Sequence, residues 1–322
     1  MALQGDFKMI TTGTPVENHL GELWNLFRFI NPGLLGSLKE FNQRFAVPIE
    51  VQNSREVKQQ LKQLIRPFIL RRMKSDVLTE LPARTEVTLH VELDAQEQAF
   101  YEALRREAIK RLAETDEEAN PGKQRVKMLA EIMRLRRACC NPRLVMPDST
   151  VGSAKLKAFG SVLQELLESR HKALVFSQFV GHLDILRDYL EQKGISYQYL
   201  DGSTPAQQRQ RAVEAFQSGD GDVFLISLKA GGAGLNLTAA DYVIHMDPWW
   251  NPAVEDQASD RAHRMGQQRP VTIYRLVAKN TIEEKIVGMH EQKRDLANSL
   301  LEGSDMSGRM SVDEMMALLR EA

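Results

Sequence analysis

The second half of the chain alternates short apolar runs with amphipathic stretches. The apolar runs predict strands at KALVFSQF, ISYQYLDG, DVFLISL, DYVIHMD and VTIYRLVA. Two stretches between them, HLDILRDYLEQKG and STPAQQRQRAVEAFQSG, predict helices, the first of which ends at Gly194. Strands that alternate with helices through short connections predict an α/β fold, a mostly parallel sheet flanked by helices.

Capping residues predict where two of the helices begin. Thr204 is expected to be the N-cap of one helix, with Pro205 in its first turn and Gln207 three residues after the cap. Thr281 and Glu284 have the spacing of a capping box at the start of the last long helix. Residues 303–322 are expected to form a tail with a short amphipathic helix.

Residues 1–50 have the pattern of the end of a larger unit. FKMITTG predicts a short strand, and HLGELWNLFRFIN predicts a helix. The apolar stripe of that helix contains Leu20, Leu23, Trp24, Phe27 and Ile30. A lone strand and helix cannot close a sheet, so either later elements complete it or its partners precede Met1.

Between residues 51 and 150 the pattern changes to charged helices, and a largely helical insertion region is expected there. One alternating strand, TEVTLHVEL, separates the first two helices, and TDEEANPGKQ predicts an exposed loop. MPDSTVGSAK is the best candidate for a linker. We therefore expect four parts, at residues 1–50, 51–150, 151–302 and 303–322.

Composition narrows the class of protein. The 322 residues carry a net charge of -1, and 43% are hydrophobic, as in a globular chain with room for two domains. No apolar run approaches the roughly 20 residues of a membrane span, and no secretory signal is visible. Cys139 and Cys140 are adjacent, which disfavours a disulfide, and no Cys/His set predicts a zinc site. We expect an intracellular protein, in the cytoplasm or nucleoid or in a nucleus, with no membrane partner.

Glycine-rich and aromatic segments follow two of the predicted strands. These are LKAGGAGLNL and DPWWNP. Because the carboxyl ends of parallel strands meet at one edge of a sheet, both are candidates for a site. The glycines allow a ligand to approach the backbone, but they suit a tight turn equally well, and they do not match GxGxxG. The tryptophans can stack on a ligand or fill the core.

The segment QASDRAHRMGQQ follows the tryptophans. Arg261 and Arg264 are three residues apart, at helical spacing. A pair of rigid guanidinium groups at this spacing favours an anionic ligand. The alternative is a solvent-exposed helix face with an ion pair between Asp260 and Arg264.

Taken in order along the chain, these motifs resemble the SWI/SNF-type branch of superfamily-two helicase-like ATPases. The matching segments are TTGTPVENHLGELWNLFRFINPGLLG, PFILRRMKSDVLTELP, LVFSQF, YLDGSTP, SLKAGGAGLNLTAADYVIHMDPWWNP and QASDRAHRMGQQRPV. That family has two RecA-like lobes with ATP between them. The resemblance implies that residues 1–50 end the first lobe, 51–150 form a helical protrusion and linker, and 151–302 form the second lobe.

The resemblance also implies roles for individual residues. Arg261 and Arg264 would be arginine fingers, and Gln257 would help to orient the nucleotide. Residues that couple the nucleotide state to DNA would be Thr12, Gly13, Thr14, Gly232, Gly234 and Asn236, with Arg71 and Arg72 in a further coupling motif. DNA phosphates would be contacted by Ser177, Gln178, Ser203, Thr204, Lys229 and Trp249. For Ser203 and Thr204 the alternative is helix capping alone.

The sequence departs from the complete family in the phosphate-binding motifs. No GxxxxGK[ST] is present, because Gln124 follows the only Gly-Lys pair, and TDEEAN is not a DExH box. ATP and Mg²⁺ would therefore be held mainly by an amino-terminal RecA-like lobe outside this chain. We expect the carboxyl-terminal part of a DNA-dependent ATPase and duplex translocase that acts on DNA-bound protein complexes, hydrolysis-deficient alone. The alternatives are a non-catalytic lobe that binds DNA or protein and, less favoured, a strand-separating helicase.

Overall fold

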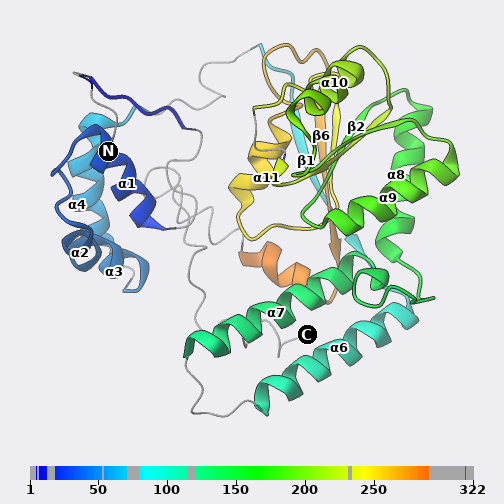
Figure 1. Cartoon of the computed structure of the whole chain (residues 1–322), viewed down its shortest axis with the longest axis horizontal. Helices are drawn as coiled ribbons and strands as arrows, with labels where there is room; N and C mark the ends of the chain where they lie inside the picture. The colour runs from blue at the N-terminus through cyan, green and yellow to red at the C-terminus, as the bar shows by residue number, and fades with distance from the viewer. Residues whose placement is uncertain are drawn as a thin grey trace. The chain divides into compact units, whose positions relative to one another are not determined.

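The computed structural model describes residues 5, 7–12, 19–52, 54–70, 80–114, 121–230, 234–289 and 316. The chain divides into two compact units (Figure 1). The first contains Met1–Val77, Trp250–Ala253 and Gly288–Met310, and the second contains Leu78–Trp249, Val254–Val287 and Ser311–Ala322. In the described residues, no helix is both long enough and apolar enough to cross a membrane.

The second unit is built on a six-stranded sheet in the order β1-β6-β5-β2-β4-β3. Every pairing is parallel, so the predicted α/β architecture is confirmed. The register places Arg84 opposite Val271 and Ala173 opposite Val223. The strands are β1 (Arg84–Val91), β2 (Ala173–Ser177), β3 (Tyr197–Leu200), β4 (Val223–Ser227), β5 (Tyr242–His245) and β6 (Val271–Ala278).

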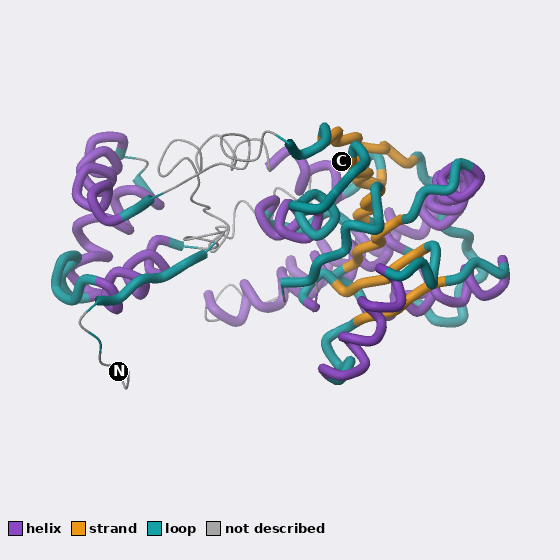
Figure 2. Tube along the Cα trace, turned by 90° about the horizontal axis from the view of Figure 1, so that it is seen from above, coloured by secondary structure: helices purple, strands orange, loops and turns teal. Residues whose placement is uncertain are grey.

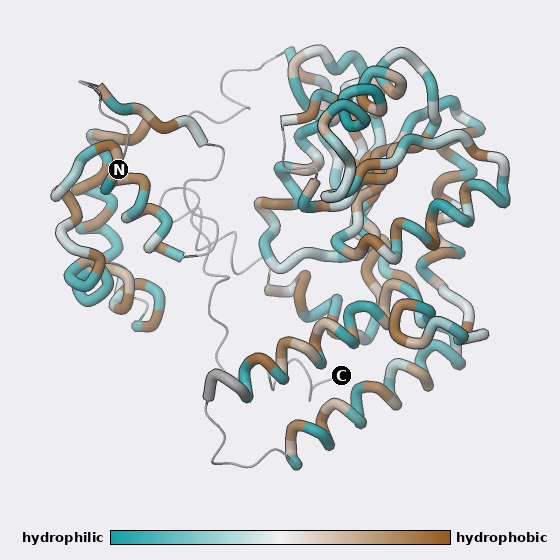
Figure 3. Tube along the Cα trace, viewed as in Figure 1, coloured by the Kyte–Doolittle hydropathy of each residue, from teal (hydrophilic) through white to brown (hydrophobic). Residues whose placement is uncertain are grey.

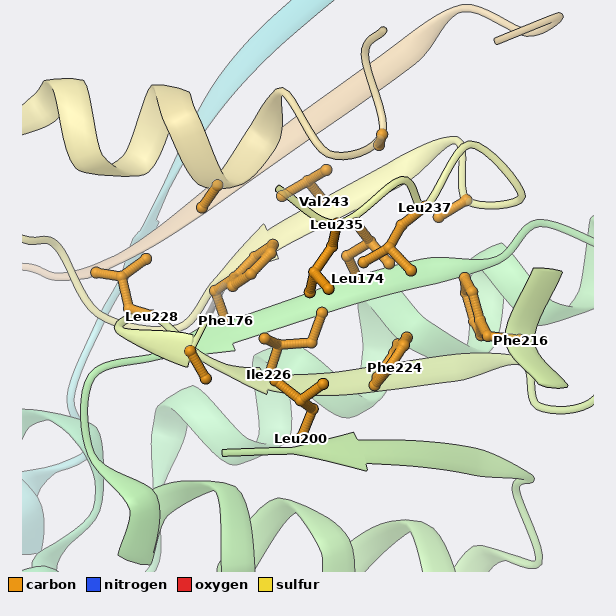
Figure 4. Close-up of a cluster of buried hydrophobic side chains, with 14 of the residues drawn as sticks. Leu174, Phe176, Leu200, Phe216, Phe224, Ile226, Leu228, Leu235, Leu237 and Val243 are labelled. Atoms are coloured by element: carbon orange, nitrogen blue, oxygen red, sulfur yellow. The ribbon is translucent and has the colours of Figure 1, made fainter. Parts of the chain in front are cut away.

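Helices cover both faces of this sheet (Figure 2). On one face, α8 (Ala154–Glu168) and α9 (Val180–Lys193) pack on Val175, Leu225 and Ile244. On the other face, α10 (Ala206–Gln217) and α11 (Pro252–Ser259) are close to Phe176, Ile226 and Val243 (Figure 4). Successive side chains of a strand point to opposite faces, so strands covered on both sides are apolar throughout. The central strands β2 and β4 are accordingly buried along their whole length, in the part of the chain that Figure 3 colours as hydrophobic.

The region expected to be a helical insertion contains α6 (Ala95–Ala113) and α7 (Pro121–Cys140), which pack together and precede η3 (Pro142–Leu144). The predicted strand before them is β1, and it pairs with β6, so the sheet extends across the expected boundary at residue 150. The expected linker is also tightly packed at its end. Ser153 caps α8, and the side chain of Lys155 is fully buried. In TDEEANPGKQ, residues 115–120 lie outside the described residues, and the rest begins α7.

The first unit is a cluster of short helices around its own core. Its elements are α1 (Leu20–Ile30), α2 (Leu38–Phe41), the π-helical turn η1 (Asn42–Ala46), α3 (Val47–Glu50), α4 (Arg55–Ile65) and η2 (Arg66–Phe68). The predicted stripe of α1 is confirmed, because Leu23 and Phe27 are buried against Phe41 and Ile65. The carboxylate of Glu50 accepts the N–H of Leu20 at 2.6 Å, which ties α3 to the start of α1.

The predicted strand FKMITTG is wrong in the described part of that segment. Residues 7–12 have no strand conformation, and Phe7 and Met9 are 84% and 70% exposed. An extended segment becomes a strand only when a neighbouring strand binds its N–H and C=O groups. The described residues of the first unit include no such strand.

The predicted capping box at Thr204 is also wrong. Helix α10 begins at Ala206 after Pro205, and its first turn receives no side-chain cap. The hydroxyl of Thr204 instead accepts the N–H of Asp201 at 3.0 Å. The carboxylate of Asp201 accepts N–H and O–H donors from Ser203 and Thr204. Hydrogen bonds from Ser203 keep the pKa of Asp201 below its usual range. The Thr204 oxygen that would cap α10 is used within this turn, by the N–H of Asp201.

Candidate functional site: the carboxyl edge of the sheet and the arginine turn

Three neighbouring strands end side by side at the carboxyl edge of the sheet. The N–H of Leu228 donates to the carbonyl of Ser177 at 2.9 Å, and the N–H of Met246 donates to the carbonyl of Phe176 at 2.9 Å. In the sheet, strand β2 lies between β4 and β5. The chain therefore passes over β2 as it runs from the end of β4 to the start of β5. Such a switch in strand order is where open α/β sheets bind ligands. We call Ser177, Gln178, Lys229 and Trp249 the carboxyl-edge residues.

Asp247 organises the loop after β2. Its carboxylate accepts the hydroxyl of Ser177 at 2.5 Å and the N–H of Gln178 at 3.2 Å. Ser177 is 1% exposed, and its oxygen also accepts the N–H of Phe179. Its hydroxyl therefore shapes the turn from inside. The side-chain Nε2 of Gln178 is buried and has no hydrogen-bond partner among the described residues.

The other residues expected to bind DNA differ in exposure. Lys229 and Ser203 are exposed, and Thr204 is half-buried at the end of β3.

The residues expected to couple the nucleotide state to DNA are described only in part. In the loop after β4, Gly234 has a φ of +67° and Asn236 is exposed. Gly232 lies outside the described residues, as do Gly13, Thr14, Arg71 and Arg72, whereas Thr12 is described and exposed.

Arg136 of α7 holds two loops of the carboxyl edge in place. One guanidinium nitrogen donates to the carbonyl of Pro248 at 2.5 Å. The guanidinium carbon lies 5.8 Å from the ring centre of Trp249 and 5.9 Å from that of Phe179. Trp249 is half-buried and packs on the core. Within RLRRACC no sequence signal distinguishes Arg136 from Arg137, so sequence reasoning missed this contact.

Glu255 of α11 fixes the loop that carries Trp249 and Trp250, here called the tryptophan loop, from the other side. It is fully buried, accepts the N–H of Trp249 at 2.7 Å and pairs with Nε of Arg275 on β6 at 2.6 Å. Burial by itself would lower the pKa of Arg275, but the carboxylate of Glu255 raises it above its usual value. The start of the loop, α11 and β6 are thus joined by one buried charge pair.

Glu255→Gln is expected to lower the free energy of unfolding by about 1.5–3 kcal/mol, the size of a lost hydrogen bond to a charged group. Glutamine keeps an acceptor for Trp249 but leaves the guanidinium of Arg275 without its buried counter-ion. Denaturant unfolding measures the change. Asp256→Asn is the matched control, because its partner Arg84 keeps Glu86 and Asp260. A loss for Asp256→Asn as large as that for Glu255→Gln would contradict the assignment.

Arg261 and Arg264 lie in a turn, so the prediction that one helix bears both is wrong. Helix α11 ends at Ser259, and residues 260–266, here called the arginine turn, follow it. Two carbonyls that a helix continuing to residue 266 would use are taken by other donors, one of them distant in the sequence. The N–H of Leu237 donates to Arg261 O at 3.0 Å, and the side chain of Gln267 donates to Ala262 O at 3.1 Å.

The surroundings of the two arginines differ from the alternative reading, an ion pair between Asp260 and Arg264. Asp260 pairs with Arg84 at 3.4 Å, and Arg264 donates to the carbonyl of Leu235 at 3.0 Å. Arg261 is 7% exposed, and within the described part of the chain its Nε has no hydrogen-bond partner. Burial lowers the pKa of Arg261, and the nearby charge of Arg264 lowers it further. Two crowded cations with an unused donor are suited to an anion.

The loop after β4 connects the two groups of candidate residues. It begins with Lys229 at the carboxyl edge, and its later residues Leu235 and Leu237 bond to the arginine turn. Gln267 strengthens this contact by donating to the carbonyls of Thr238 and Ala240. Gln257 lies half-buried on α11, ahead of the arginine turn. A change in the position of this loop would therefore change the hydrogen bonds that hold the arginine turn, which carries both arginines.

A buried cluster of possible metal ligands lies behind the carboxyl edge. Donor atoms of Cys140, His182 and Asp247 lie within 4.8 Å of one another. Burial raises the pKa of Cys140 and lowers that of His182 to about 3, so both side chains are neutral near pH 7. The cations of Lys155 and Arg136 already act on this cluster. The carboxylates of Asp247 and Glu283 act on it as well.

Comparison with known proteins finds two matching families. The SNF2-related domain matches residues 1–144, and the helicase conserved C-terminal domain matches residues 155–266. The putative ATP-dependent helicase/translocase YwqA of Bacillus subtilis is 37% identical over 98% of this chain and 35% of the relative. The ISWI chromatin-remodeling complex ATPase CHR11 of Arabidopsis thaliana is 35% identical over 98% of this chain and 30% of the relative. The chain thus spans about a third of their length.

Solved structures show the same relationship. The SWI2/SNF2 ATPase core domain of Sulfolobus solfataricus matches with a TM-score of 0.63 and 32% identity, over 97% of this chain and 64% of that one. The same core in complex with duplex DNA matches with a TM-score of 0.62 and 31% identity, over 97% and 66%.

Proposed function

Because the chain belongs to the SWI/SNF (SNF2-related) family of ATP-dependent helicases, we propose that it is the carboxyl-terminal part of a DNA-dependent ATPase that translocates on duplex DNA. The observation that carries this proposal is the arginine turn. It holds the buried guanidinium group of Arg261, whose Nε has no hydrogen-bond partner among the described residues, and the half-buried one of Arg264, which bonds to the loop that begins at the carboxyl edge.

The residues present fit the phosphates of ATP but offer little to Mg²⁺. Arg261 and Arg264 can donate to phosphate oxygens, and Gln257 can orient the nucleotide. The carboxylates beside them, Glu255, Asp256 and Asp260, are paired with arginines of β1 and β6. Mg²⁺ would therefore be held mainly by an amino-terminal RecA-like lobe, together with most of the phosphate contacts. Hydrolysis of ATP supplies the free energy for movement of the lobes.

On the DNA side, the proposed contacts are to backbone phosphates. Lys229 and Ser203 are exposed donors, and Gln178 has an amide without an internal partner. Such donors position a protein on DNA without reading its sequence. We assign Ser177 and Thr204 to shaping these loops, since their hydroxyls bond to Asp247 and Asp201. The hydrogen bonds from the loop after β4 to the arginine turn support coupling of DNA contact to phosphate contact.

The proposal is tested by measuring ATP hydrolysis by this chain with and without duplex DNA, and again after adding a lobe that carries the P-loop. We expect no hydrolysis by the chain alone and DNA-stimulated hydrolysis by the two parts together. The second candidate is a non-catalytic lobe that binds DNA or protein, and it is favoured if the added lobe restores nothing. Efficient hydrolysis by the chain alone would contradict a split site. A strand-displacement assay separates translocation from strand separation.

A further inference from the structure

One side of α4 carries a stripe of basic residues. Arg55, Lys58 and Lys62 lie on α4, and Arg66 follows directly as its C-cap. At about 100° and 1.5 Å per residue, these positions fall within an arc of about 80° and span about 16 Å along the axis. Arg55, Lys62 and Arg66 are exposed, and Lys58 is half-buried. The buried residues of α4, Leu61 and Ile65, lie outside this arc.

Folding of the first unit does not account for the whole stripe. Lys62 and Arg66 lie at the carboxyl end of α4, where the helix dipole favours cations, but Arg55 and Lys58 lie toward the amino end, where it opposes them. Burial lowers the pKa of Lys58, and the neighbouring charges of Lys62 and Arg55 lower it further. Like charges at this spacing destabilise a helix. The repulsion between these like charges is therefore a cost to the helix that a bound anion would relieve.

Helices α6 and α7 neutralise several of their arginines internally. Arg105 pairs with Glu102 on α6, and Arg134 of α7 pairs with Glu107 of α6. In the residues that the structure describes, no carboxylate lies within ion-pair distance of Arg55, Lys62 or Arg66. Glu56, the acidic residue of α4, lies about 100° around the helix from Arg55.

Positive charge is concentrated in this part of the chain. Residues 1–77 contain 11 lysines and arginines against 7 aspartates and glutamates, whereas the whole chain contains 42 against 43. The stripe is thus the most regular row of cations in a locally basic segment, and it lies on a different unit from Lys229.

We propose that the basic stripe of α4, made by Arg55, Lys58, Lys62 and Arg66, binds backbone phosphates of duplex DNA as a contact separate from the carboxyl-edge residues. Duplex DNA presents a phosphate about every 3.4 Å per strand along its axis, so a row of about 16 Å meets several of them. The exposed neighbours of the stripe on α4 are Gln59 and Gln63. A helix that binds a membrane needs an exposed apolar face beside its basic one, which these glutamines do not provide. The inference rests on the proposed function, because duplex DNA is the ligand of both.

The test compares two double variants of the chain. Arg55→Gln with Lys62→Gln neutralises the stripe, and Arg106→Gln with Lys110→Gln removes the same charge from an exposed part of α6. Fluorescence anisotropy measures affinity for a labelled duplex over a range of salt concentrations. Each lost phosphate contact lowers the slope of log K against log salt by about 0.9, so the stripe variant should lose about 2 and the α6 variant none. Thermal unfolding checks that both variants remain folded.

An unchanged slope for the stripe variant, or an equal loss for the α6 variant, would overturn the inference. Lys229→Gln separates this failure from failure of the proposed function. If Lys229→Gln lowers the slope and the stripe variant does not, DNA binding stands and only the stripe is rejected. If the unmodified chain binds no duplex, both are rejected. Binding to anionic phospholipid vesicles that the stripe variant loses, with DNA affinity unchanged, would assign the stripe to a membrane.

Discussion

Replacing Arg264 with alanine is expected to lower ATP turnover by roughly 10³–10⁵-fold when the chain acts with the lobe that holds the phosphates. This corresponds to about 4–7 kcal/mol of transition-state stabilisation. The reason is that a guanidinium group beside a transferring phosphoryl group stabilises negative charge that develops only in the transition state. Arg264 lies half-buried in the arginine turn and is held there by the carbonyl of Leu235.

The measurement is kcat at saturating ATP and duplex DNA. Arg264→Lys keeps the charge but loses the planar fork, so it should recover only a small part of the rate. Arg269→Ala is the matched control, since Arg269 is exposed and pairs with Asp241 outside the arginine turn. A value of kcat for Arg264→Ala within a few-fold of the unmodified protein would remove Arg264 from the catalytic role. The same measurement on Arg261→Ala asks whether both arginines act.

Lys155→Met is expected to produce the largest loss of stability, about 3–5 kcal/mol, because it leaves a buried carboxylate without its counter-ion. The ammonium group of Lys155 lies 2.6 Å from a carboxylate oxygen of Glu283, with side-chain exposures of 0% and 1%. Burial by itself would lower the pKa of Lys155, but Glu283 raises it above its usual value. Lys155 also donates to the carbonyl of Met246 at 2.8 Å, next to Asp247.

Denaturant unfolding of three variants tests this assignment. Lys157→Met removes an exposed lysine that lies 3.6 Å from Asp94, and it should cost no more than about 1 kcal/mol. Lys155→Met combined with Glu283→Leu removes both charges and should recover much of the loss, since an apolar pair can replace a buried ion pair. If the double variant is less stable than Lys155→Met alone, the loss comes from packing and not from the unpaired charge.

Sequence patterns predicted the elements whose formation depends on neighbouring residues. Helix α1 follows from its apolar stripe, and the end of α9 follows from Gly194, which has a φ of +66°. The parallel sheet follows from the alternation of strands and helices, because each apolar run must be buried on both faces. The same motifs identified the family and singled out Arg261, Arg264 and Lys229 as candidates; their roles remain predictions.

The positions of those candidates were decided by contacts between residues far apart in the chain. The sequence predicted a helix through Arg261 and Arg264, but the N–H of Arg264 bonds to the carbonyl of Ala262 instead of that of Asp260, and Leu237, 24 residues away, donates to the carbonyl of Arg261. Arg136 resembles its neighbour Arg137 in the sequence, and only folding brings it to Pro248, 112 residues away.

The sequence by itself therefore determined most of its element types, its family and which side chains are candidates to contact a phosphate. Tertiary structure alone decided where helix α11 ends, that the hydroxyl of Ser177 points to Asp247, and which arginine holds the tryptophan loop. The physical reason is the distance along the sequence over which each kind of interaction acts. Backbone propensity and side-chain period act over a few residues, whereas a buried polar group must find its partner wherever the fold supplies one.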